Sequence, residues 1–237
     1  LVLAIRVLIP LLLSGWQPVG LAIGLGILIT IVSFMLTQGL GRTTVAAILG
    51  TSIGLGITGL LAVLVTGLAQ FTPAQGSETV IYLQQLLGDK IDLSGLLLAA
   101  VIFGALGVLD DVAIGQAATV EELARADPTL DGRALYRRAM NVGVAHLAAT
   151  INTLVFAYLG TALPLLVLLS LELEQFSLSV NQELVAVEIV RAVVGSLGIL
   201  AAVPATTAIA AWWQRPAARA GAVSLVTAEA ATPALDV

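Results

Sequence analysis

The sequence predicts an all-α protein that crosses a membrane several times as a helical bundle. Of its 237 residues, 59% are hydrophobic and 11% are charged, and the mean hydropathy is +1.05. Ordinary soluble domains are about one quarter charged. Apolar runs of roughly twenty residues, which is the length that crosses a bilayer as a helix, recur along the chain. No strand-like alternation of apolar and polar residues is visible, so a β-barrel is not expected.

The composition also argues against several kinds of chemistry. The chain has no cysteine, which excludes disulfides, thiolate catalysis and iron–sulfur clusters. It has one histidine, His146, so a histidine-based metal site is not expected, and nothing predicts a cofactor. The net charge is −5 and there is no basic patch for nucleic acid. The partner that the composition predicts is the lipid bilayer.

The apolar runs define a single transmembrane domain over residues 1–213. Leu1–Leu13 is short for a span and begins without Met, so we interpret it as the end of a truncated helix. A turn with Trp16 as an interfacial anchor follows it. Five full spans are then predicted, at residues 19–36, 45–68, 93–120, 142–171 and 184–213. The Ala-rich residues 214–237 lack periodicity and are predicted to be a disordered tail.

Residues 121–141 are the most charged part of the chain. Pro128 ends the preceding helix, and Asp131 is placed to cap a new one. We predict an amphipathic interfacial helix over about 131–141, with its arginines in water and its apolar side chains against the bilayer. The following segment, 142–171, is predicted to bend or break near Gly160 and Pro164.

The distribution of lysine and arginine predicts the orientation. One set of loops carries Arg42, the four arginines of 125–138, Arg215 and Arg219, whereas the opposite set carries Lys90 alone. The first set is therefore predicted to be cytoplasmic, with the C-terminus on the same side. This parity holds only if 142–171 crosses the membrane once.

Two adjacent acids, Asp110 and Asp111, lie inside the apolar span 93–120. Acids are costly inside a membrane and usually mark an interior or a water path. Helical spacing places Asp111 on one face with Gly104, Gly107 and Gly115, while Asp110 is turned about 100° away. Asp111 is therefore the first candidate for proton coupling and Asp110 the second. The alternative is a structural hydrogen-bonding role or a simply solvated carboxyl.

Candidate partners for Asp111 lie on the next span. His146, Thr150 and Thr153 share a face there, with Asn152 beside it, so a contact between the two faces would give Asp111 hydrogen-bond partners. The alternative for these residues is helix packing, and His146 lies near the membrane interface. Glu188 and Arg191, three apart on the last span, are interpreted as a structural ion pair. Glycine pairs at 20 and 24 and at 50 and 54 indicate places where a partner helix comes close.

Several segments together resemble the YibE/F family of bacterial multi-pass membrane proteins. They read GALGVLDDVAIGQA, ARADPTLDGRALYRRAMNVG and NTLVFAYLGTALPLLVLL, with LIPLLLSGWQPV near the start and EIVRAVVGSLGILAAVPATTAIA near the end. The resemblance implies that Asp111 matches the usual single acid of the family and that Asp110 is additional. It also implies a bacterial inner membrane, and longer relatives with a further span and an extracytoplasmic domain. The chain departs from the family's Gly-Arg-Asp with Gly143, Val144 and Ala145.

A more distant similarity is to half of a resistance-nodulation-division transporter or of SecD/SecF. Those proteins use an aspartate in the matching span for proton coupling, which is an analogy at the level of the fold. The leading hypothesis is a permease-like transporter that moves protons or an unknown solute. The alternative is a non-transporting membrane scaffold or assembly factor with a protein or oligomeric partner. An enzyme is not expected, because no Ser–His or metal-ligand arrangement is present.

Overall fold

The computed structural model describes residues 2–69, 82–83, 85–86, 88, 92–171 and 183–230. It confirms the all-α prediction. The helices are α1 (Val2–Leu13), α2 (Pro18–Thr37), α3 (Arg42–Ala69), α5 (Leu93–Ala126), α6 (Gly132–Thr161), α7 (Leu163–Leu171) and α9 (Glu183–Ala230). Within the described residues, five stretches are long and apolar enough to cross a membrane: Pro18–Thr37, Arg42–Leu68, Leu93–Ala126, Gly132–Thr161 and Val185–Gln214.

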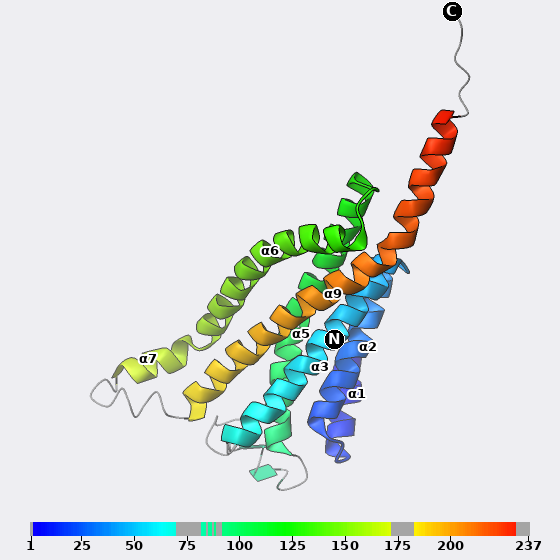
Figure 1. Cartoon of the computed structure of the whole chain (residues 1–237). Coiled ribbons are helices and arrows are strands. Elements are labelled where there is room, and N and C mark those ends of the chain that lie inside the picture. Colours follow the sequence, from blue (N-terminus) through cyan, green and yellow to red (C-terminus); the bar gives the residue numbers. More distant parts are fainter. Residues whose placement is uncertain are drawn as a thin grey trace, which may run out of the picture.

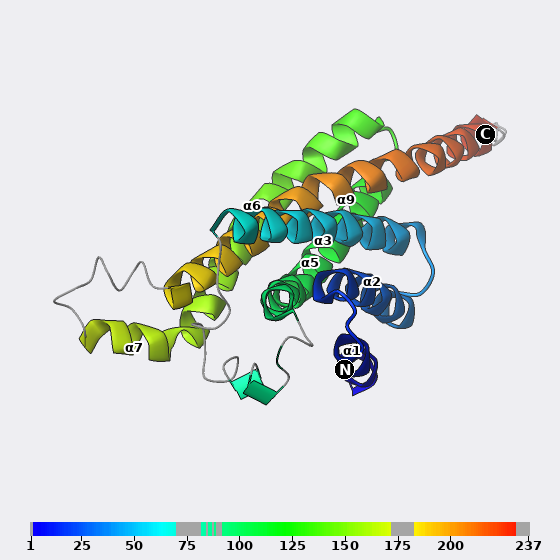
Figure 2. The ribbon, with the colours of Figure 1, turned by 90° about the horizontal axis from the view of Figure 1, so that it is seen from below.

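Helix α5 is the centre of the bundle (Figures 1 and 2). It packs against α2, α3, α6 and α9, while α1 packs on α2 at the outside. Half of the most apolar window of α5 is buried, compared with 11% for α6. Its inward side carries Ile102, Leu109 and Val112, which meet Leu55 of α3 and Ile199 of α9 in one core cluster. Among the candidate spans, α5 is therefore the one whose side chains are most often buried inside the bundle.

Glycine allows α3 and α9 to approach closely. A Cβ added to Gly50 would lie 1.7 Å from Thr206 Oγ1, and one added to Gly198 would lie 1.9 Å from Thr58 Oγ1. Both distances are far inside van der Waals contact, so only glycine fits. The predicted close approach at residues 50 and 54 is thus present. The same prediction for Gly20 and Gly24 was wrong, because a Cβ at either position meets no described atom within 4 Å.

The short connections between helices follow the turn chemistry of the sequence. Gly15 and Gly39 have φ of 88° and 72°, in the left-handed region that favours glycine. At the start of α6, Asp131 Oδ1 accepts a hydrogen bond from the Ala134 N–H at 2.7 Å. This is the cap predicted from the sequence. Asp92 caps α5 in the same way, through the Gly95 N–H at 3.0 Å.

Helix α6 joins two segments that the sequence analysis separated. The predicted interfacial helix at about 131–141 and the first part of the predicted span 142–171 form one continuous helix. Figure 1 shows this helix crossing the end of the bundle and then bending down beside α9. The helix ends at Thr161, and α7 begins after Ala162, which is the position of the predicted break.

Helix α9 continues to Ala230, where the sequence analysis predicted a disordered tail from residue 214. The part of α9 that is long and apolar enough to cross a membrane is Val185–Gln214. Alanine is the best helix former, so an Ala-rich segment favours continuation of the helix. Figure 1 shows this extension leaving the bundle. Residues 231–237, Lys90, residues 172–182 and most of residues 70–91 lie outside the described residues.

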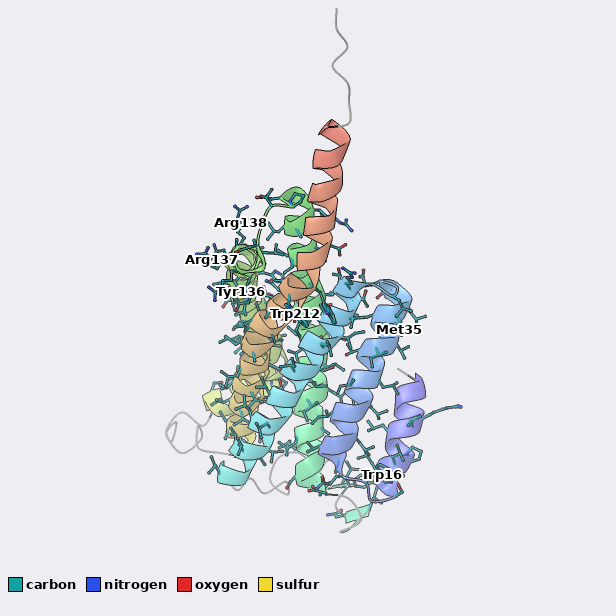
Figure 3. All side chains as sticks on the ribbon, turned by 45° about the vertical axis from the view of Figure 1, so that its right-hand side comes forward. Trp16, Met35, Tyr136, Arg137, Arg138 and Trp212 are labelled. Atoms are coloured by element: carbon teal, nitrogen blue, oxygen red, sulfur yellow. The ribbon has the colours of Figure 1, made fainter. Side chains whose placement is uncertain are left out.

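The two ends of the bundle differ in character. Figure 3 shows Arg137 and Arg138 at the end where α5 turns into α6, and Trp16 at the opposite end. Trp212 and Met35 lie toward the arginine-bearing end. Arginine at one end with tryptophan toward both ends is the pattern of a protein that spans a bilayer. We call the end near the α5–α6 turn the arginine-rich end.

Candidate functional site

The Asp110 carboxylate faces α2 and α3 in the middle of the bundle. Its Oδ1 accepts a hydrogen bond from Thr30 Oγ1 of α2 at 2.9 Å, and Thr30 is fully buried. Thr51 of α3 lies beside the same carboxylate. Its hydroxyl is buried and has no hydrogen-bond partner within the described part of the chain. Three helices therefore bring a carboxyl and two hydroxyls together, one of them available for a further bond.

The sequence of each helix explains why these groups meet. On α5, Leu106, Leu109 and Ala113 are buried, and Asp110 lies at the edge of this buried side. On α2, Gly26 lies one turn before Thr30, and a Cβ there would lie 2.9 Å from Leu55 Cδ2. The missing side chain lets α2 and α3 come together, which places the Thr30 hydroxyl against α5.

Asp111 points the other way, to the outside of the bundle. Its side chain is exposed, and Gly107 and Gly115 beside it are exposed too. A Cβ added to either glycine would meet no described atom within 4 Å. On the face that the spacing predicted, no described helix covers Gly107, Asp111 or Gly115, whereas a Cβ at Gly104 would lie 3.6 Å from the Tyr158 hydroxyl of α6. Both aspartates line an open groove between α2 and α5 with a volume of about 600 Å³. Among the described residues, neither aspartate forms an ion pair.

The structure does not bring the predicted α6 partners to Asp111. Thr150 and Thr153 donate to backbone carbonyls of their own helix, His146 O at 2.9 Å and Ala149 O at 3.0 Å. His146 and Asn152 are exposed. The inward side of α6 carries small and apolar residues instead, namely Ala139, Gly143 and Leu154. Because α6 packs through this side, the predicted polar face is turned away from α5.

One buried polar residue was missed by sequence reasoning. Gln116 of α5 is 3% exposed, and its Nε2 donates to Ala139 O of α6 at 3.0 Å and to Thr207 Oγ1 of α9 at 2.8 Å. A Cβ at Gly143 would lie 2.7 Å from Gln116 Oε1, so the glycine leaves room for this amide. The signal was a lone glutamine in an apolar span, which must find partners when buried.

The Glu188–Arg191 pair forms within α9. Arg191 Nη1 donates to Glu188 Oε1 at 2.9 Å, and the side chain of Arg191 is 23% exposed and that of Glu188 is 27% exposed. The buried hydroxyl of Tyr158 has no hydrogen-bond partner within the described residues. It lies near both Gly195 of α9 and Gly104 of α5. Neither Glu188 nor Arg191 lines the groove that holds the two aspartates.

No metal centre is indicated in the part of the chain that the structure describes. It holds no group of three or more His, Cys, Asp or Glu side chains placed around one point. The polar groups around Asp110 are hydroxyls, which exchange hydrogen bonds with a carboxyl according to its protonation state. The arrangement is therefore suited to holding a carboxyl in either its charged or its neutral form.

Comparison with known proteins places this chain among membrane proteins. Residues 1–216 match the family described as YibE/F-like protein. No curated protein matches the chain, and no solved structure does either. The family match covers every helix from α1 through the membrane-crossing part of α9.

Proposed function

This chain belongs to the YibE/F-like protein family, and from that premise we propose that it is a proton-coupled, permease-like membrane protein. Asp110 is the group that exchanges the proton, and Asp111 is the second carboxyl in the groove beside it. The transported solute is unassigned. The arginine-rich end and the C-terminus face the cytoplasm of a bacterial inner membrane, as the lysine and arginine distribution predicts.

The observation that carries this proposal is the position of Asp110. Its carboxylate lies within an apolar span, accepts the Thr30 hydroxyl at 2.9 Å and has no cation beside it among the described residues. Acids inside membrane spans that face a bundle interior typically belong to ion pathways and proton relays. Asp110 also borders the open groove, so it is reachable from outside the core.

The three helices around Asp110 give protonation a mechanical consequence. A charged carboxylate accepts the hydrogen bond from Thr30 of α2, while the Thr51 hydroxyl of α3 lies beside it without a partner among the described residues. Once protonated, the carboxyl becomes a donor, and the Thr51 hydroxyl, which lacks another partner, accepts from it. The balance of bonds between α5 and its two neighbours therefore changes with one proton, which is how a local charge change biases a packed element.

The test is proton flux in proteoliposomes that contain the purified chain and a pH-sensitive dye. Asp110→Asn keeps the size and hydrogen bonding of the side chain and removes its titration. We expect Asp110→Asn to abolish proton flux. Asp111→Asn, at the neighbouring position on the outer face, is the matched control and should keep a substantial part of the flux. Equal flux in wild type and Asp110→Asn liposomes, at equal protein content, would remove the proposal.

A non-transporting scaffold or assembly factor is the second candidate function. The open face with Gly107, Asp111 and Gly115 favours it, because a helix of another protein or of a second copy can approach a glycine surface closely. A scaffold predicts no proton flux above that of empty liposomes. It also predicts that Gly107→Leu and Gly115→Leu lose a crosslinked partner while the chain stays folded.

A further inference from the structure

The groove at the aspartates continues into a second cavity toward the arginine-rich end. The first, between α2 and α5, has a volume of about 600 Å³ and is lined by Ser33, Thr37 and both aspartates. The second has a volume of about 670 Å³ and is lined by Arg42, Thr43 and Glu121. Gln38 and Ile114 line both cavities. The two are therefore neighbouring parts of one groove.

Polar and small residues form much of this groove. On α2 the lining includes Ser33, Thr37 and Gln38, three polar side chains within about one and a half turns. On α5 the lining toward the arginine-rich end includes Gly115 and Ala118, which leave space rather than fill it. An outward face meant only for lipid would carry large apolar side chains, as α2 does at Leu28 and Val32. The polar part of the lining offers hydrogen bonds to water, beside the apolar Phe34, Phe103 and Val108 that line the rest of the groove at the aspartates.

Glu121 lies at the outer end of the groove. It is eleven residues after Asp110, which is three turns of α5 and roughly 16 Å, on nearly the same side of the helix. Its carboxylate accepts a hydrogen bond from Thr43 of α3 and pairs with Arg125. Its side chain is 28% exposed. The Glu121 carboxylate is therefore held by its partners and partly exposed, and Arg42 lines the same cavity.

We propose that this groove is a water-filled conduit for protons between the arginine-rich surface and Asp110, with Glu121 as its entrance carboxylate. The conduit rests on the proposed function, since it supplies the proton that Asp110 exchanges. Water in the groove links Glu121 to the aspartates along the polar side of α2. The charged groups that face the conduit from the elements around it are Asp110, Asp111 and Glu121 of α5 and Arg42 of α3.

Hydration is tested with single cysteines, because the chain contains none of its own. Ser33→Cys and Ala118→Cys place a thiol in the groove. Val32→Cys is the matched control, since Val32 is the neighbour of Ser33, is 48% exposed and does not line either cavity. The probe is a charged, membrane-impermeant maleimide applied to vesicles from the arginine-rich side. Melting temperatures of the three variants check that each is folded.

We expect both groove thiols to react faster than Val32→Cys by about tenfold or more, because the thiolate that reacts forms only where water is present. Ser33→Cys reacting no faster than Val32→Cys would overturn the conduit. Labelling without any proton flux in the parent chain supports the conduit and overturns the proposed function. Proton flux in the parent chain without faster labelling at Ser33→Cys supports the proposed function and overturns the conduit.

The role of Glu121 has its own matched pair. Glu121→Gln and Glu122→Gln both remove a carboxylate that pairs with Arg125, but only Glu121 lines the groove. We expect Glu121→Gln to slow proton flux several-fold and Glu122→Gln to leave it near the parent rate. Equal proton flux in the two variants would show that Glu121 is not the entrance group. As a control, Ser33→Cys should be labelled equally fast in both variants, which confirms that the groove itself is intact.

Discussion

Gly50 and Gly56 lie on the same helix, α3, but meet different surroundings. A Cβ at Gly50 would lie 1.7 Å from Thr206 Oγ1, whereas one at Gly56 meets no described atom within 4 Å. The two glycines are six residues apart and look alike in the sequence. The spacing of small residues identifies a smooth surface, but whether a helix lies on that surface depends on the fold.

The first prediction compares these two glycines. Gly50→Ala pushes α3 away from α9 and is expected to lower the unfolding free energy by about 1–3 kcal/mol, the usual cost of overpacking. Gly56→Ala is expected to be neutral or slightly stabilising, because alanine is the better helix former. Thermal unfolding in one detergent measures both. Equal melting temperatures for the two variants would contradict the close α3–α9 contact.

The second prediction concerns Gln116 and Gly143. Gly143→Ala displaces the Gln116 amide, whose hydrogen bonds to Ala139 O and Thr207 Oγ1 are then weakened. We expect each single variant, Gly143→Ala and Gln116→Ala, to cost about 1–3 kcal/mol. The double variant should cost clearly less than the sum, since there is no amide left to displace. Additive costs would mean that the two residues do not interact.

At the scale of elements, the turn between α5 and α6 is held by Asp127. Its carboxylate accepts from the Thr129 hydroxyl at 2.5 Å and the Thr129 N–H at 3.2 Å, and it meets Arg138 Nη1 at 3.3 Å. The Thr129 hydroxyl is the main reason that the pKa of Asp127 lies below its ordinary value of 3.8, and Arg138 adds to the effect. The turn therefore prefers the charged carboxylate.

The third prediction follows from the sign of that shift. Because the folded pKa is lower than the unfolded one, the contribution is complete above about pH 4 and is lost as the pH falls through the folded value. Asp127→Asn should melt slightly below the parent chain at pH 6, and the two melting temperatures should converge as the pH falls through the folded pKa of Asp127. A difference that persists in acid would assign the effect to geometry rather than to charge.

The elements differ in how well the sequence predicts them. The bounds of α2 and α3 lie within three residues of the predicted apolar runs. Helix α5 continues six residues past its predicted run, to Ala126, where Pro128 marks its end, and Asp131 marks the start of α6. The packed side of α6 could not be predicted, because small residues such as Gly143 and polar residues such as Thr150 suit a helix contact equally well. For the same reason Asp111 looked like the interior acid, while the buried Leu106 and Ala113, one helical turn before and after Asp110, place Asp110 nearer the core.

At the scale of the whole molecule, the arginine-rich end is the feature that predicts the orientation in the membrane. Arg137 and Arg138 gather there, next to the α5–α6 turn (Figure 3). The chain lacks cysteine, so a single thiol reports its own location. The roles proposed for Asp110 as proton carrier and for Glu121 as entrance both require a proton pathway on this side.

The fourth prediction tests that orientation. Thr129→Cys lies in the exposed α5–α6 turn, and Trp16→Cys lies at the opposite end. An impermeant maleimide should label Thr129→Cys in inside-out vesicles and Trp16→Cys in right-side-out vesicles. The opposite pattern would reverse the orientation, and labelling of both from one side would contradict the number of crossings.

The central claim is that Asp110 exchanges protons from within the bundle. Infrared difference spectra recorded across a pH titration detect the carbonyl stretch of a protonated carboxyl directly. We expect a titrating carboxyl band in the parent chain that persists in Asp111→Asn and is absent from Asp110→Asn. A band that is unchanged by Asp110→Asn, with that variant folded, would contradict the account.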